Sequence, residues 1–509
     1  MRTLDSVVRD RASERPDAVA LIEVGRTTTF AALVDRIERV GAILDDLVGP
    51  ATPVAMIGAN DRGWVEAYFG VPASGRLLVL LNHRLHGVEL ADMIRRSGAG
   101  LVIGASAHLD RIADAGCPVP MLDRSTWSDL VDGATSVGEE RTVDPHAPAW
   151  LLFTSGTTAA PKGALLSHAS ILAAVDASTA ARPVEPDDVY AFPFPLCHVA
   201  GYNVVHRLAN GRPVALLDGF DPADFCDVVE RTGSTSCSLA ATMLASLLEL
   251  VESDPRRRSQ LATLRSVAYG ASPMPTELLR RADRVLGVDL AQGYGMTELS
   301  GNAVFLDAAS HRRGLDGEPG LLVAAGVPAP GVEVRIVDDR GGTVADGEVG
   351  EIVVRAPQVM VGYLDDPDAT AAALVDGWLR TGDLGRWDGG LLRVVDRKKD
   401  MILTGGENVA SLEVEEVVAA HPAVARVAVV GVPDARWGEN VCAVVVPSDG
   451  GSFDVDAVSA WVRGRLAGFK VPRHWWVVDS LPVNAAGKVA KAELRARLAA
   501  DPALAGPRR

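Results

Sequence analysis

The sequence predicts an α/β protein with a large N-terminal domain and a small α+β C-terminal domain. Its 509 residues are too many for one ordinary hydrophobic core, so two or more domains are expected. Over roughly the first 320 residues, short β-branched runs alternate with amphipathic stretches, a pattern typical of parallel-rich sheets covered by helices. After that region the pattern changes to short alternating strands and then to a second α+β pattern.

The N-terminal region contains clear examples of both kinds of element. Residues 53–57 and 101–103 are short apolar runs with β-branched side chains, which predicts buried strands. Residues 29–47 and 90–97 place apolar side chains at helical spacing, which predicts amphipathic helices. The alternation of such strands and helices predicts mostly parallel sheets, because parallel strands need a long crossover connection.

Short strands around turn residues then predict a small antiparallel, barrel-like β unit. Residues 332–337, 351–355 and 391–395 are short strand-like runs, and 332–337 alternates apolar and polar side chains as a strand with one buried face does. Asp346-Gly347 and Asp388-Gly389 are turn signals of the kind that joins hairpin strands.

The last part of the chain predicts a small α+β domain of about 110 residues, which is enough for a core of its own. The expected elements are a helix at 412–420 capped by Ser411, strands at 424–430 and 441–446, a helix at 455–466 and a strand at 475–478. The charged run Asp396-Arg397-Lys398-Lys399-Asp400 precedes this pattern and is the candidate linker. We therefore expect domains at 1–396 and 397–509.

Composition and charge exclude several classes of protein. The chain has 50 Lys and Arg against 66 Asp and Glu, a net charge of −16, which argues against a nucleic-acid-binding protein. Five cysteines, without a Cys-x-x-Cys pair, indicate neither a disulfide framework nor a zinc site. The charged first residues do not match a secretory signal, and no apolar run reaches the ~18 residues of a transmembrane segment. We expect a cytoplasmic protein.

The segment Leu-Leu-Phe-Thr-Ser-Gly-Thr-Thr-Ala-Ala-Pro-Lys-Gly at 151–163 is the first candidate binding site. Hydroxyl groups, exposed backbone N–H groups and one lysine are the groups that bind phosphate. The segment is not a Walker A loop, because Pro161 stands where that motif has its second glycine and Gly163 follows Lys162. An apolar run precedes it, and a helical stretch is expected after it. The competing interpretation is an exposed turn rich in Ser, Thr and Gly.

Four further segments carry residues suited to a nucleotide, and each has an ordinary structural explanation on its own. The run Gln-Gly-Tyr-Gly-Met-Thr-Glu at 292–298 offers an aromatic ring for a base, a hydroxyl for a phosphate oxygen and a carboxylate for Mg²⁺. Asp383 follows a turn, where its carboxylate is placed to accept hydrogen bonds from ribose hydroxyl groups. The charged run 396–400, continued by Thr-Gly-Gly-Glu-Asn at 404–408, is a further candidate, and its competing interpretation is a solvated stretch. Lys488, which follows a glycine, is the last candidate, and its competing interpretation is an ordinary surface lysine.

These five segments, in this order, resemble the signature motifs of the adenylate-forming superfamily, which includes acyl- and aryl-CoA synthetases, luciferases and the adenylation domains of peptide synthetases. The resemblance covers essentially the whole chain and is closest to fatty-acyl-CoA synthetases. It implies a large adenylate-binding domain and a small mobile C-terminal lid domain with its hinge near Lys399. ATP, Mg²⁺ and coenzyme A are the implied cofactors.

The resemblance implies a role for each matching residue. In the N-terminal part, Tyr294 would stack on adenine, Thr297 would contact the α-phosphate and Glu298 would bind Mg²⁺. In the C-terminal part, Lys488 would be the adenylation lysine and Lys399 the hinge. The others form the phosphate loop, the adenine-side loop, the ribose-binding pair and the loop that enters for thioester formation. They are Thr154, Ser155, Gly156, Thr157, Thr158, Lys162, Gly270, Ala271, Gln292, Gly295, Asp383, Arg397, Gly405, Gly406 and Glu407.

Charge explains why such an enzyme needs these groups. A carboxylate that attacks the α-phosphate of ATP is repelled by the triphosphate, so Mg²⁺ and lysines must neutralise the developing charge. The resemblance implies that coenzyme A attacks the acyl adenylate after the C-terminal domain swings and exchanges Lys488 for the 405–407 loop. The phosphate loop departs from the family at Ala159, where the family usually has glycine, which adopts more backbone conformations than alanine.

The segment Phe-Pro-Leu-Cys-His-Val-Ala-Gly at 194–201 resembles the family's border of the acyl pocket and makes His198 a candidate gate for the substrate carboxylate. A satisfied core histidine is the competing interpretation of His198. No carboxylate stands where peptide-synthetase domains pair with an amino group, which disfavours an α-amino acid substrate. His206 and Arg207 are candidates to pair with a second acid group, but a solvated helix face is the favoured interpretation.

The predicted function is an ATP-dependent carboxylic acid–CoA ligase of the fatty-acyl type, which forms an acyl adenylate, releases pyrophosphate and then makes the thioester. One alternative is an acyl- or aryl-AMP ligase that loads the phosphopantetheine of a separate carrier protein. Another is a catalytically lapsed binding or scaffold protein, against which the intact set of charged site residues argues. A serine hydrolase is not supported, because no Gly-x-Ser-x-Gly elbow occurs. The expected partners are a small carboxylic acid and coenzyme A, and no nucleic acid.

Overall fold

The computed structural model describes residues 2–135, 141–154, 161–270, 274–434, 436–448, 453–484, 487–501 and 504. The chain divides into two compact units. Unit 1 comprises residues 1–271, 281–334 and 354–379, and unit 2 comprises residues 272–280, 335–353 and 380–509. Residue 397 lies inside the longest segment of unit 2, and the domain boundary between 396 and 397 stays a prediction.

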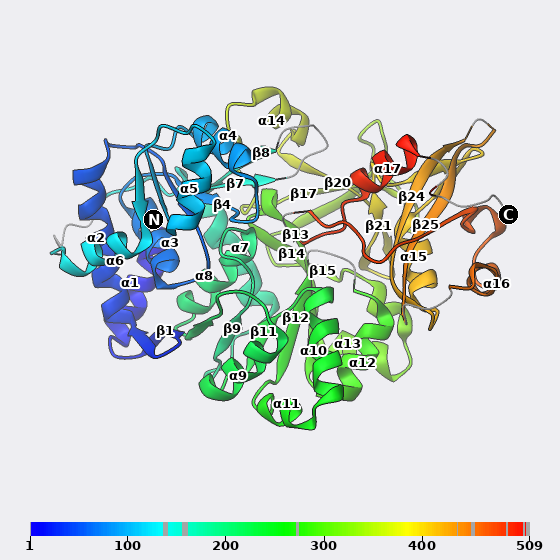
Figure 1. Ribbon diagram of the computed structural model, residues 1–509, viewed down its shortest axis with the longest axis horizontal. Coiled ribbons are helices and arrows are strands. Elements are labelled where there is room, and N and C mark those ends of the chain that lie inside the picture. The colour runs from blue at the N-terminus through cyan, green and yellow to red at the C-terminus, as the bar shows by residue number, and fades with distance from the viewer. Residues whose placement is uncertain are drawn as a thin grey trace. The chain divides into compact units, whose positions relative to one another are not determined.

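The first sheet of unit 1 is mostly parallel, as the alternation of strands and helices predicts (Figure 1). Within the described residues its nine strands are, in spatial order, β15 (Val327–Pro328), β14 (Gly301–Leu306), β13 (Asp289–Met296), β12 (Ser266–Gly270), β11 (Ser236–Ser238), β9 (Tyr190–Phe192), β10 (Val214–Leu216), β1 (Val19–Glu23) and β2 (Arg26–Thr29). The six strands from β13 to β1 in this order pair in parallel, whereas β2, β14 and β15 pair antiparallel at the two edges.

The second sheet of unit 1 combines a parallel part with an antiparallel edge. Within the described residues its seven strands are, in spatial order, β18 (Gly362–Tyr363), β8 (Lys162–Ser167), β7 (Pro148–Thr154), β4 (Leu78–Leu81), β3 (Val54–Ile57), β5 (Leu101–Gly104) and β6 (Met121–Asp123). The strands from β7 to β6 pair in parallel, and β8 and β18 continue the sheet antiparallel. Every residue of β3, β4 and β5 is buried, as their continuous apolar runs predict.

Several helices of the N-terminal part begin at polar residues that satisfy their first N–H groups. Thr29 accepts a hydrogen bond from the Ala32 amide, and Asp61 accepts one from the Trp64 amide. None of the described helices combines the length and the apolar character of a membrane span. The helices are α1 (Leu4–Glu14), α2 (Phe30–Leu47), α3 (Arg62–Ala73), α4 (Gly87–Ser97), α5 (Ser106–Asp114), α6 (Arg124–Gly133), α7 (His168–Ala181), η1 (Val199–Gly201), α8 (Tyr202–Ala209), α9 (Pro222–Thr232), α10 (Ala241–Ser253), α11 (Pro255–Gln260), α12 (Thr276–Leu286), η2 (Thr297–Leu299), α13 (Ala308–Asp316), η3 (Pro319–Val323) and α14 (Pro367–Ala373).

The short strands predicted around the Asp-Gly turns form a small antiparallel sheet. Its strands are β16 (Glu333–Val337), β17 (Gly350–Arg355), β20 (Trp378–Asp388) and β19 (Leu374–Val375) in that order, with β21 (Leu391–Arg397) paired to β20. Gly389 and Gly390 connect β20 to β21 with φ angles of +58° and +80°, which glycine adopts without strain.

The C-terminal part of unit 2 has a mixed sheet with an apolar core on each face. Its strands are β23 (Glu407–Val409), β22 (Ile402–Thr404), β25 (Gly438–Pro447), β24 (Val424–Asp434) and β26 (His474–Val477), and its helices are α15 (Ser411–Ala419), α16 (Val455–Arg463), η4 (Gly468–Lys470) and α17 (Lys491–Ala500). Val441, Ala443 and Val445 pack with residues of α15 and α16, whereas Cys442 and Val444 pack with residues of α17. This alternation is the two-residue period of a strand buried on both faces.

Helix α15 begins one residue earlier than predicted, and Ser411 is not its cap. Ala410 occupies the N-cap position, and Ser411 is the first helical residue and fully buried. The Ser411 amide donates to the carboxylate of Asp396, and its hydroxyl accepts a 2.6 Å hydrogen bond from Lys491 Nζ. A carboxylate from β21 therefore binds the first N–H group of this helix, and no serine occupies the cap position.

All five cysteines are buried and free. Burial raises the pKa of Cys197 and of Cys442 to about 12 and that of Cys226 to about 11, because a thiolate would lose its hydration. These side chains are therefore neutral thiols near neutral pH and pack as small apolar groups.

His168 joins the first helix of unit 1 to α7. It is 1% exposed, and its Nδ1 accepts a 3.1 Å hydrogen bond from the Leu4 amide. Burial lowers the pKa of His168 to about 4, because a charged imidazolium would lose its hydration. The folded chain therefore holds a neutral imidazole at this position near neutral pH.

Replacing His168 with asparagine is expected to make folding less sensitive to acid. The unfolded chain takes up a proton on His168 near pH 6.5, whereas the folded chain does so only near pH 4, so stability falls as the pH drops through this window. At pH 5 the loss is about 2 kcal/mol. Asparagine keeps an acceptor for the Leu4 amide and takes up no proton. Urea denaturation of both proteins at neutral pH and at pH 5 measures the difference, and equal acid sensitivity would contradict it.

Candidate functional site

Two hydroxyl groups hold the carboxylate of Glu298 in the interior of unit 1. Glu298 lies in η2, directly after β13, and is 6% exposed. Its Oε1 accepts a 2.9 Å hydrogen bond from the Tyr363 hydroxyl and a 3.4 Å hydrogen bond from Thr154 Oγ1. Burial and the charge of Glu298 raise the pKa of Tyr363, so its hydroxyl stays protonated and donates. The structure thus brings together two residues that the sequence predicts for one site, Thr154 and Glu298.

The second oxygen of this carboxylate is left for a ligand. Within the described residues, Glu298 Oε2 makes no hydrogen bond, whereas Oε1 accepts both. Mg²⁺ is usually held by one or two carboxylates together with substrate phosphates. In the described part of the chain, no group of three or more His, Cys, Asp or Glu side chains is placed to hold a metal ion. A single carboxylate with one free oxygen fits Mg²⁺ that arrives bound to a nucleotide.

The predicted phosphate loop lies between two antiparallel strands. β7 ends at Thr154, β8 begins at Lys162, and these two residues are partners in the ladder. The prediction of a helical stretch directly after the loop is wrong, because residues 162–167 pair with the apolar run of β7 and the helix begins only at His168. The loop residues Ser155, Gly156, Thr157, Thr158 and Ala159 lie outside the described residues.

Tyr363 connects the phosphate hairpin to Glu298. The Lys162 Nζ lies 5.1 Å from the centroid of the Tyr363 ring, a distance typical of a cation–π contact. Tyr363 lies in β18, which pairs with β8 along the same sheet. One tyrosine therefore contacts a lysine through its ring and the Glu298 carboxylate through its hydroxyl. Tyr363 could not be identified from the sequence, because a single tyrosine in a two-residue strand has no distinguishing pattern.

The backbone around Glu298 is braced from both sides. Ser300 follows the turn with a φ of +53°, which is unusual for a residue other than glycine, and its amide donates to the Thr297 carbonyl at 2.9 Å. The buried Gln358 side-chain amide donates to two carbonyl groups of the neighbouring turn, at 2.8 and 3.0 Å. The Met360 amide donates to the Glu298 carbonyl at 2.9 Å. Strain of this kind persists where the surroundings fix it, as they do at functional sites.

Close approach of three strands explains the glycines of the predicted adenine side. Gly270 ends β12 opposite Gly293 in β13, and a side chain on Gly270 would collide with the Gly293 carbonyl oxygen. A side chain on Gly295 would collide with the Gly301 carbonyl oxygen in β14. The other predicted residues here are Gln292 and Tyr294, which are half-buried in β13, and Ala271, which lies outside the described residues.

In unit 2, Asp383 and Arg397 are partners in the ladder of β20 and β21. The Arg397 Nε lies 3.5 Å from Asp383 Oδ1. The Asp383 amide donates to Thr381 Oγ1 at 3.1 Å, and Gly382 between them has a φ of +72°. The structure thus brings the predicted ribose-binding pair together, with a carboxylate able to accept two hydroxyl hydrogen bonds.

The charged run around Lys399 is solvated only in part, because its three cations are exposed whereas the two carboxylates at its ends are buried. Asp396 and Asp400 are buried, at 1% and 8% exposure. The amides of Asp400 and Met401 donate to the Arg397 carbonyl at 2.9 and 3.1 Å, which closes a turn with Lys399 at its third position. Partial burial, followed by the charge of Arg397, lowers the pKa of Lys399. The predicted hinge residue therefore lies in a tight turn between two buried carboxylates.

Two further turns hold the remaining predicted residues of unit 2. Gly405 and Gly406 connect β22 to β23 with φ angles of +62° and +87°, as in a two-residue hairpin of type I′. Glu407 is exposed and begins β23. The Lys488 amide donates to Asn484 Oδ1 at 3.0 Å, and the Lys488 carbonyl accepts from the Asn484 amide at 2.7 Å.

The prediction of a solvated face at His206 and Arg207 is wrong. Both residues are buried in α8, at 0% and 8% exposure. The Arg207 Nη1 lies 3.1 Å from Asp188 Oδ2, and its guanidinium lies 4.7 Å from the centroid of the Tyr190 ring. Burial lowers the pKa of His206 well below its usual value. Helices α7 and α1 pack against this short helix and bury it. The order of apolar and polar residues within α8 does not indicate these contacts. His198, which directly precedes η1, is half-buried.

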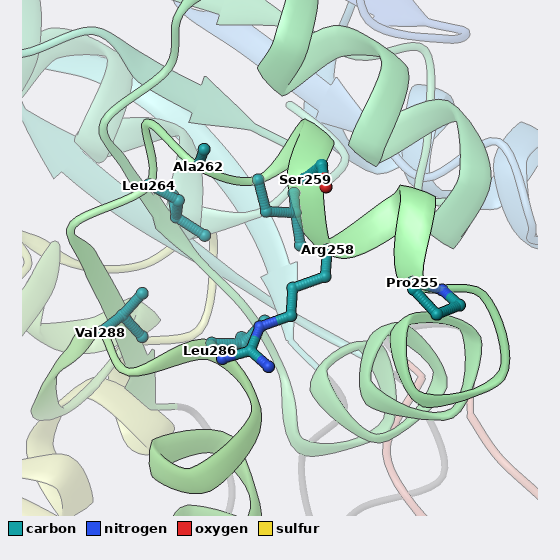
Figure 2. A pocket seen from close by; sticks show the side chains of 8 residues that line it. Pro255, Arg258, Ser259, Ala262, Leu264, Leu286 and Val288 are labelled. Atoms are coloured by element: carbon teal, nitrogen blue, oxygen red, sulfur yellow. The ribbon is translucent and has the colours of Figure 1, made fainter.

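A separate hollow of unit 1 contains none of the predicted site residues. It has a volume of about 340 Å³ and lies around α11 (Figure 2). Arg258 and Ser259 are its polar residues, and Figure 2 shows Arg258 extended toward Leu286. The lining residues are Pro255, Arg258, Ser259, Leu261, Ala262, Leu264, Leu286 and Val288.

Comparison with protein families finds two matches that together span most of the chain. The AMP-binding enzyme family matches residues 8–364, and the AMP-binding enzyme C-terminal domain matches residues 413–488. The fold and these two matches define an adenylate-forming enzyme with a large α/β domain and a small C-terminal domain. The chain belongs to the family of AMP-binding enzymes.

Similar proteins are ligases that activate carboxylic acids. A feruloyl-CoA synthase of Amycolatopsis is 37% identical over 493 residues, 96% of this chain and 97% of the relative. The fatty acid–[acyl-carrier-protein] ligase ScoC of Streptomyces coeruleorubidus is 33% identical, over 99% and 98% of the two chains. The o-succinylbenzoate-CoA synthetase MenE of Bacillus subtilis, solved with its acyl-adenylate OSB-AMP, has a TM-score of 0.84 and 30% identity over 96% and 97%. MenE has also been solved with ATP and a magnesium ion, and adenylate-forming CoA ligases use ATP, Mg²⁺ and coenzyme A.

Glu298→Gln is expected to raise the Mg²⁺ concentration needed for half-maximal acid-dependent pyrophosphate exchange by about tenfold or more, because a neutral amide is a poorer ligand for a hard cation than a carboxylate. Titration of Mg²⁺ at fixed ATP measures this. Glu351→Gln is the control, since Glu351 is equally buried and pairs with Arg380 at 2.6 Å. An unchanged magnesium titration in the folded Glu298 variant would assign the metal to another group.

Proposed function

We propose that this chain is an ATP-dependent carboxylic acid–CoA ligase that forms an acyl adenylate and releases pyrophosphate before it makes the thioester. The arrangement around Glu298 carries the proposal, because this buried carboxylate accepts a hydrogen bond from Thr154 in the hairpin that brackets the phosphate loop and has a second oxygen with no hydrogen bond among the described residues. Lys162 at the other end of that loop supplies a cation. A metal-binding carboxylate together with a phosphate-binding lysine is what transfer at a phosphate requires.

In the proposed first half-reaction, a carboxylate oxygen of the acid attacks the α-phosphorus of ATP and pyrophosphate leaves. Mg²⁺, when bound, would neutralise part of the charge on the phosphates. Glu298 holds the ion, while Tyr363 and Thr154 fix the orientation of its carboxylate. Thr297 contacts the α-phosphate, and Lys488 neutralises the charge that develops during attack.

In the proposed second half-reaction, the sulfur of coenzyme A attacks the acyl carbonyl carbon, the thioester C–S bond forms and AMP leaves. The exposed Gly405-Gly406 turn supports a role for this loop, because two glycines present backbone groups without covering side chains. Lys399 is the proposed hinge between the two half-reactions, since its turn joins β21 to β22.

The proposed substrate is an apolar monocarboxylic acid, a class that contains the predicted fatty acids. Arg207 was the candidate to pair with a second acid group, but it is buried and paired with Asp188. His206 beside it is neutral and buried, because burial lowers its pKa. Helix α8 therefore offers no cation to a second carboxylate. His198 remains the candidate gate for the single carboxylate.

A panel of acids tests this proposal. Ferulate, phenylacetate, octanoate, palmitate and succinate are each incubated with ATP and Mg²⁺, with and without coenzyme A, and pyrophosphate, AMP and thioester are measured. The expected result is pyrophosphate release with an apolar acid and thioester formation only with coenzyme A. Thioester formed only on a phosphopantetheinylated carrier protein would favour the carrier-loading alternative. Absence of acid-dependent pyrophosphate release across the panel would favour a binding or scaffold protein.

Lys488→Ala is expected to slow adenylation by about 10²–10³-fold, the scale for loss of one electrostatic donor in a transition state. Thioester formation from a supplied acyl adenylate should remain, because that step develops no charge on the attacked phosphate. Lys470→Ala is the control, since Lys470 forms a 2.7 Å ion pair with Glu413. Wild-type adenylation by the Lys488 variant would show that this lysine has another role.

Lys399→Pro is expected to retain acid-dependent pyrophosphate exchange and to lose most thioester formation. The Lys399 amide makes no hydrogen bond within the described residues, but proline fixes φ near −65° and restricts Lys398. A junction that must adopt two conformations would then be confined to one of them.

Lys399→Ala is the matched control, because it removes the same side chain without fixing the backbone. It should keep both half-reactions near their wild-type rates. Circular dichroism of each variant checks folding. Equal retention of both half-reactions in the proline variant would show that this turn is only a connection.

A further inference from the structure

A single asparagine ties down the loop that carries His198. Asn60 follows β3 and is 8% exposed. Its side-chain nitrogen donates to the carbonyl oxygens of Phe194 at 2.7 Å and Leu217 at 2.8 Å, and its Oδ1 accepts a 2.8 Å hydrogen bond from the Leu196 amide. All three bonds go to backbone groups. We call this set of bonds the Asn60 anchor.

The Asn60 anchor joins the carboxyl ends of strands from the two sheets of unit 1. Asn60 lies after β3 in one sheet, and Phe194 and Leu217 lie after β9 and β10 in the other. In α/β folds, ligands bind outside the carboxyl ends of the parallel strands. A neutral carboxamide provides two donors and an acceptor in one plane, whereas a carboxylate provides acceptors alone. The position therefore requires an amide side chain.

A second buried group fixes the same loop. Tyr68 of α3 is fully buried, and its hydroxyl donates to the Leu196 carbonyl. Gly201 packs against this ring, and a side chain there would collide with the Tyr68 hydroxyl. Between these contacts, the His198 amide donates to the Pro195 carbonyl at 3.2 Å, and the His198 carbonyl accepts from the Gly201 amide at 2.9 Å. The backbone of His198 is therefore held on both sides.

His198 is the residue of this loop with the chemistry to meet a carboxylate. Its neighbour Cys197 is buried, and burial raises the pKa of Cys197 to about 12, so this thiol is neutral and unreactive. His198 is half-buried. The backbone hydrogen bonds on both sides of it leave its loop little conformational freedom.

We propose that Asn60 is a positioning residue for the substrate acid, which acts by fixing the backbone that presents His198. The inference rests on the proposed function. Without the Asn60 anchor, a smaller fraction of the molecules has the loop in the conformation that binds the acid. The apparent affinity for the acid falls in proportion to that fraction. The residues assigned to Mg²⁺ and phosphate, Glu298 and Thr154, make no bond to this loop within the described residues, so the binding of ATP is unaffected.

Asn60→Ala is expected to raise the KM for the acid about tenfold or more, because it removes the two hydrogen bonds that hold the loop at Phe194 and Leu196 and the one that ties them to Leu217. The KM for ATP should change by less than about twofold. Acid-dependent pyrophosphate exchange at varied acid and at varied ATP measures both values. At neutral pH, Asn60→Asp should raise the KM for the acid more than Asn60→Ala does, because an ionised carboxylate has no donor for the two carbonyl groups. Lower pH should partly restore acid binding, because a protonated carboxyl regains one donor.

Asn210→Ala is the matched control. The Asn210 side-chain nitrogen also donates two hydrogen bonds, to the His206 carbonyl at 2.8 Å and to Thr179 Oγ1 at 3.0 Å, in the same unit. It makes no bond to residues 194–198 among the described ones. An equal rise of the acid KM in this control, or a joint rise of both KM values in Asn60→Ala, would overturn the proposal.

Hydrogen exchange separates failure of this inference from failure of the proposed function. The Leu196 amide bonds to Asn60 Oδ1, so Asn60→Ala should accelerate its exchange about tenfold without any substrate, and Asn210→Ala should not. Unchanged exchange in Asn60→Ala would overturn the Asn60 anchor. Accelerated exchange in a chain whose wild type activates no acid would keep the anchor and overturn the proposed function.

Discussion

A buried carboxylate must be held by donors before it can hold a cation, and the hydrogen bond from Tyr363 to Glu298 meets this requirement. An unpaired carboxylate in a protein interior is strongly disfavoured, so the position of this tyrosine constrains everything around it. The tyrosine reaches Glu298 because β18 continues the sheet antiparallel to β8. The same sheet places Thr154 on the carboxylate, and the turn that carries Glu298 is fixed by Gln358. The two ends of the phosphate loop and the candidate metal ligand are thereby set relative to one another.

The sequence could predict what local patterns encode. The amphipathic helix at 29–47, the buried strands at 53–57 and 101–103 and the residue types of the phosphate loop were all readable from short windows. The contacts of Tyr363 and Asn60 were not, because they join residues 65 and 136 positions apart, respectively. The favoured interpretation of His206 and Arg207 placed them on a helix, as α8 does, but the burial of this helix depends on α7 and α1, which lie elsewhere in the sequence.

Two buried side chains in this chain fix the backbone of candidate functional segments. Asn60 and Gln358 each bond to backbone groups of a segment distant in sequence. A bond to a peptide group is indifferent to the side chain that the bonded residue carries. Loops fixed in this way can change their side chains, and with them the acid that they accept, while their backbone keeps its place. Such an arrangement suits a family whose members act on different acids with one nucleotide chemistry.

Because all five cysteines are buried, the surface of the native chain offers no thiol to thiol-specific reagents. Maleimide dyes and spin labels react with exposed thiolates, and the native chain presents none. A cysteine introduced on an exposed position would therefore be the single labelled site, without prior removal of native cysteines. Pairs of such labels, one in each unit, would make the distance between the units in solution directly measurable by energy transfer or electron spin resonance, before and after each substrate is added.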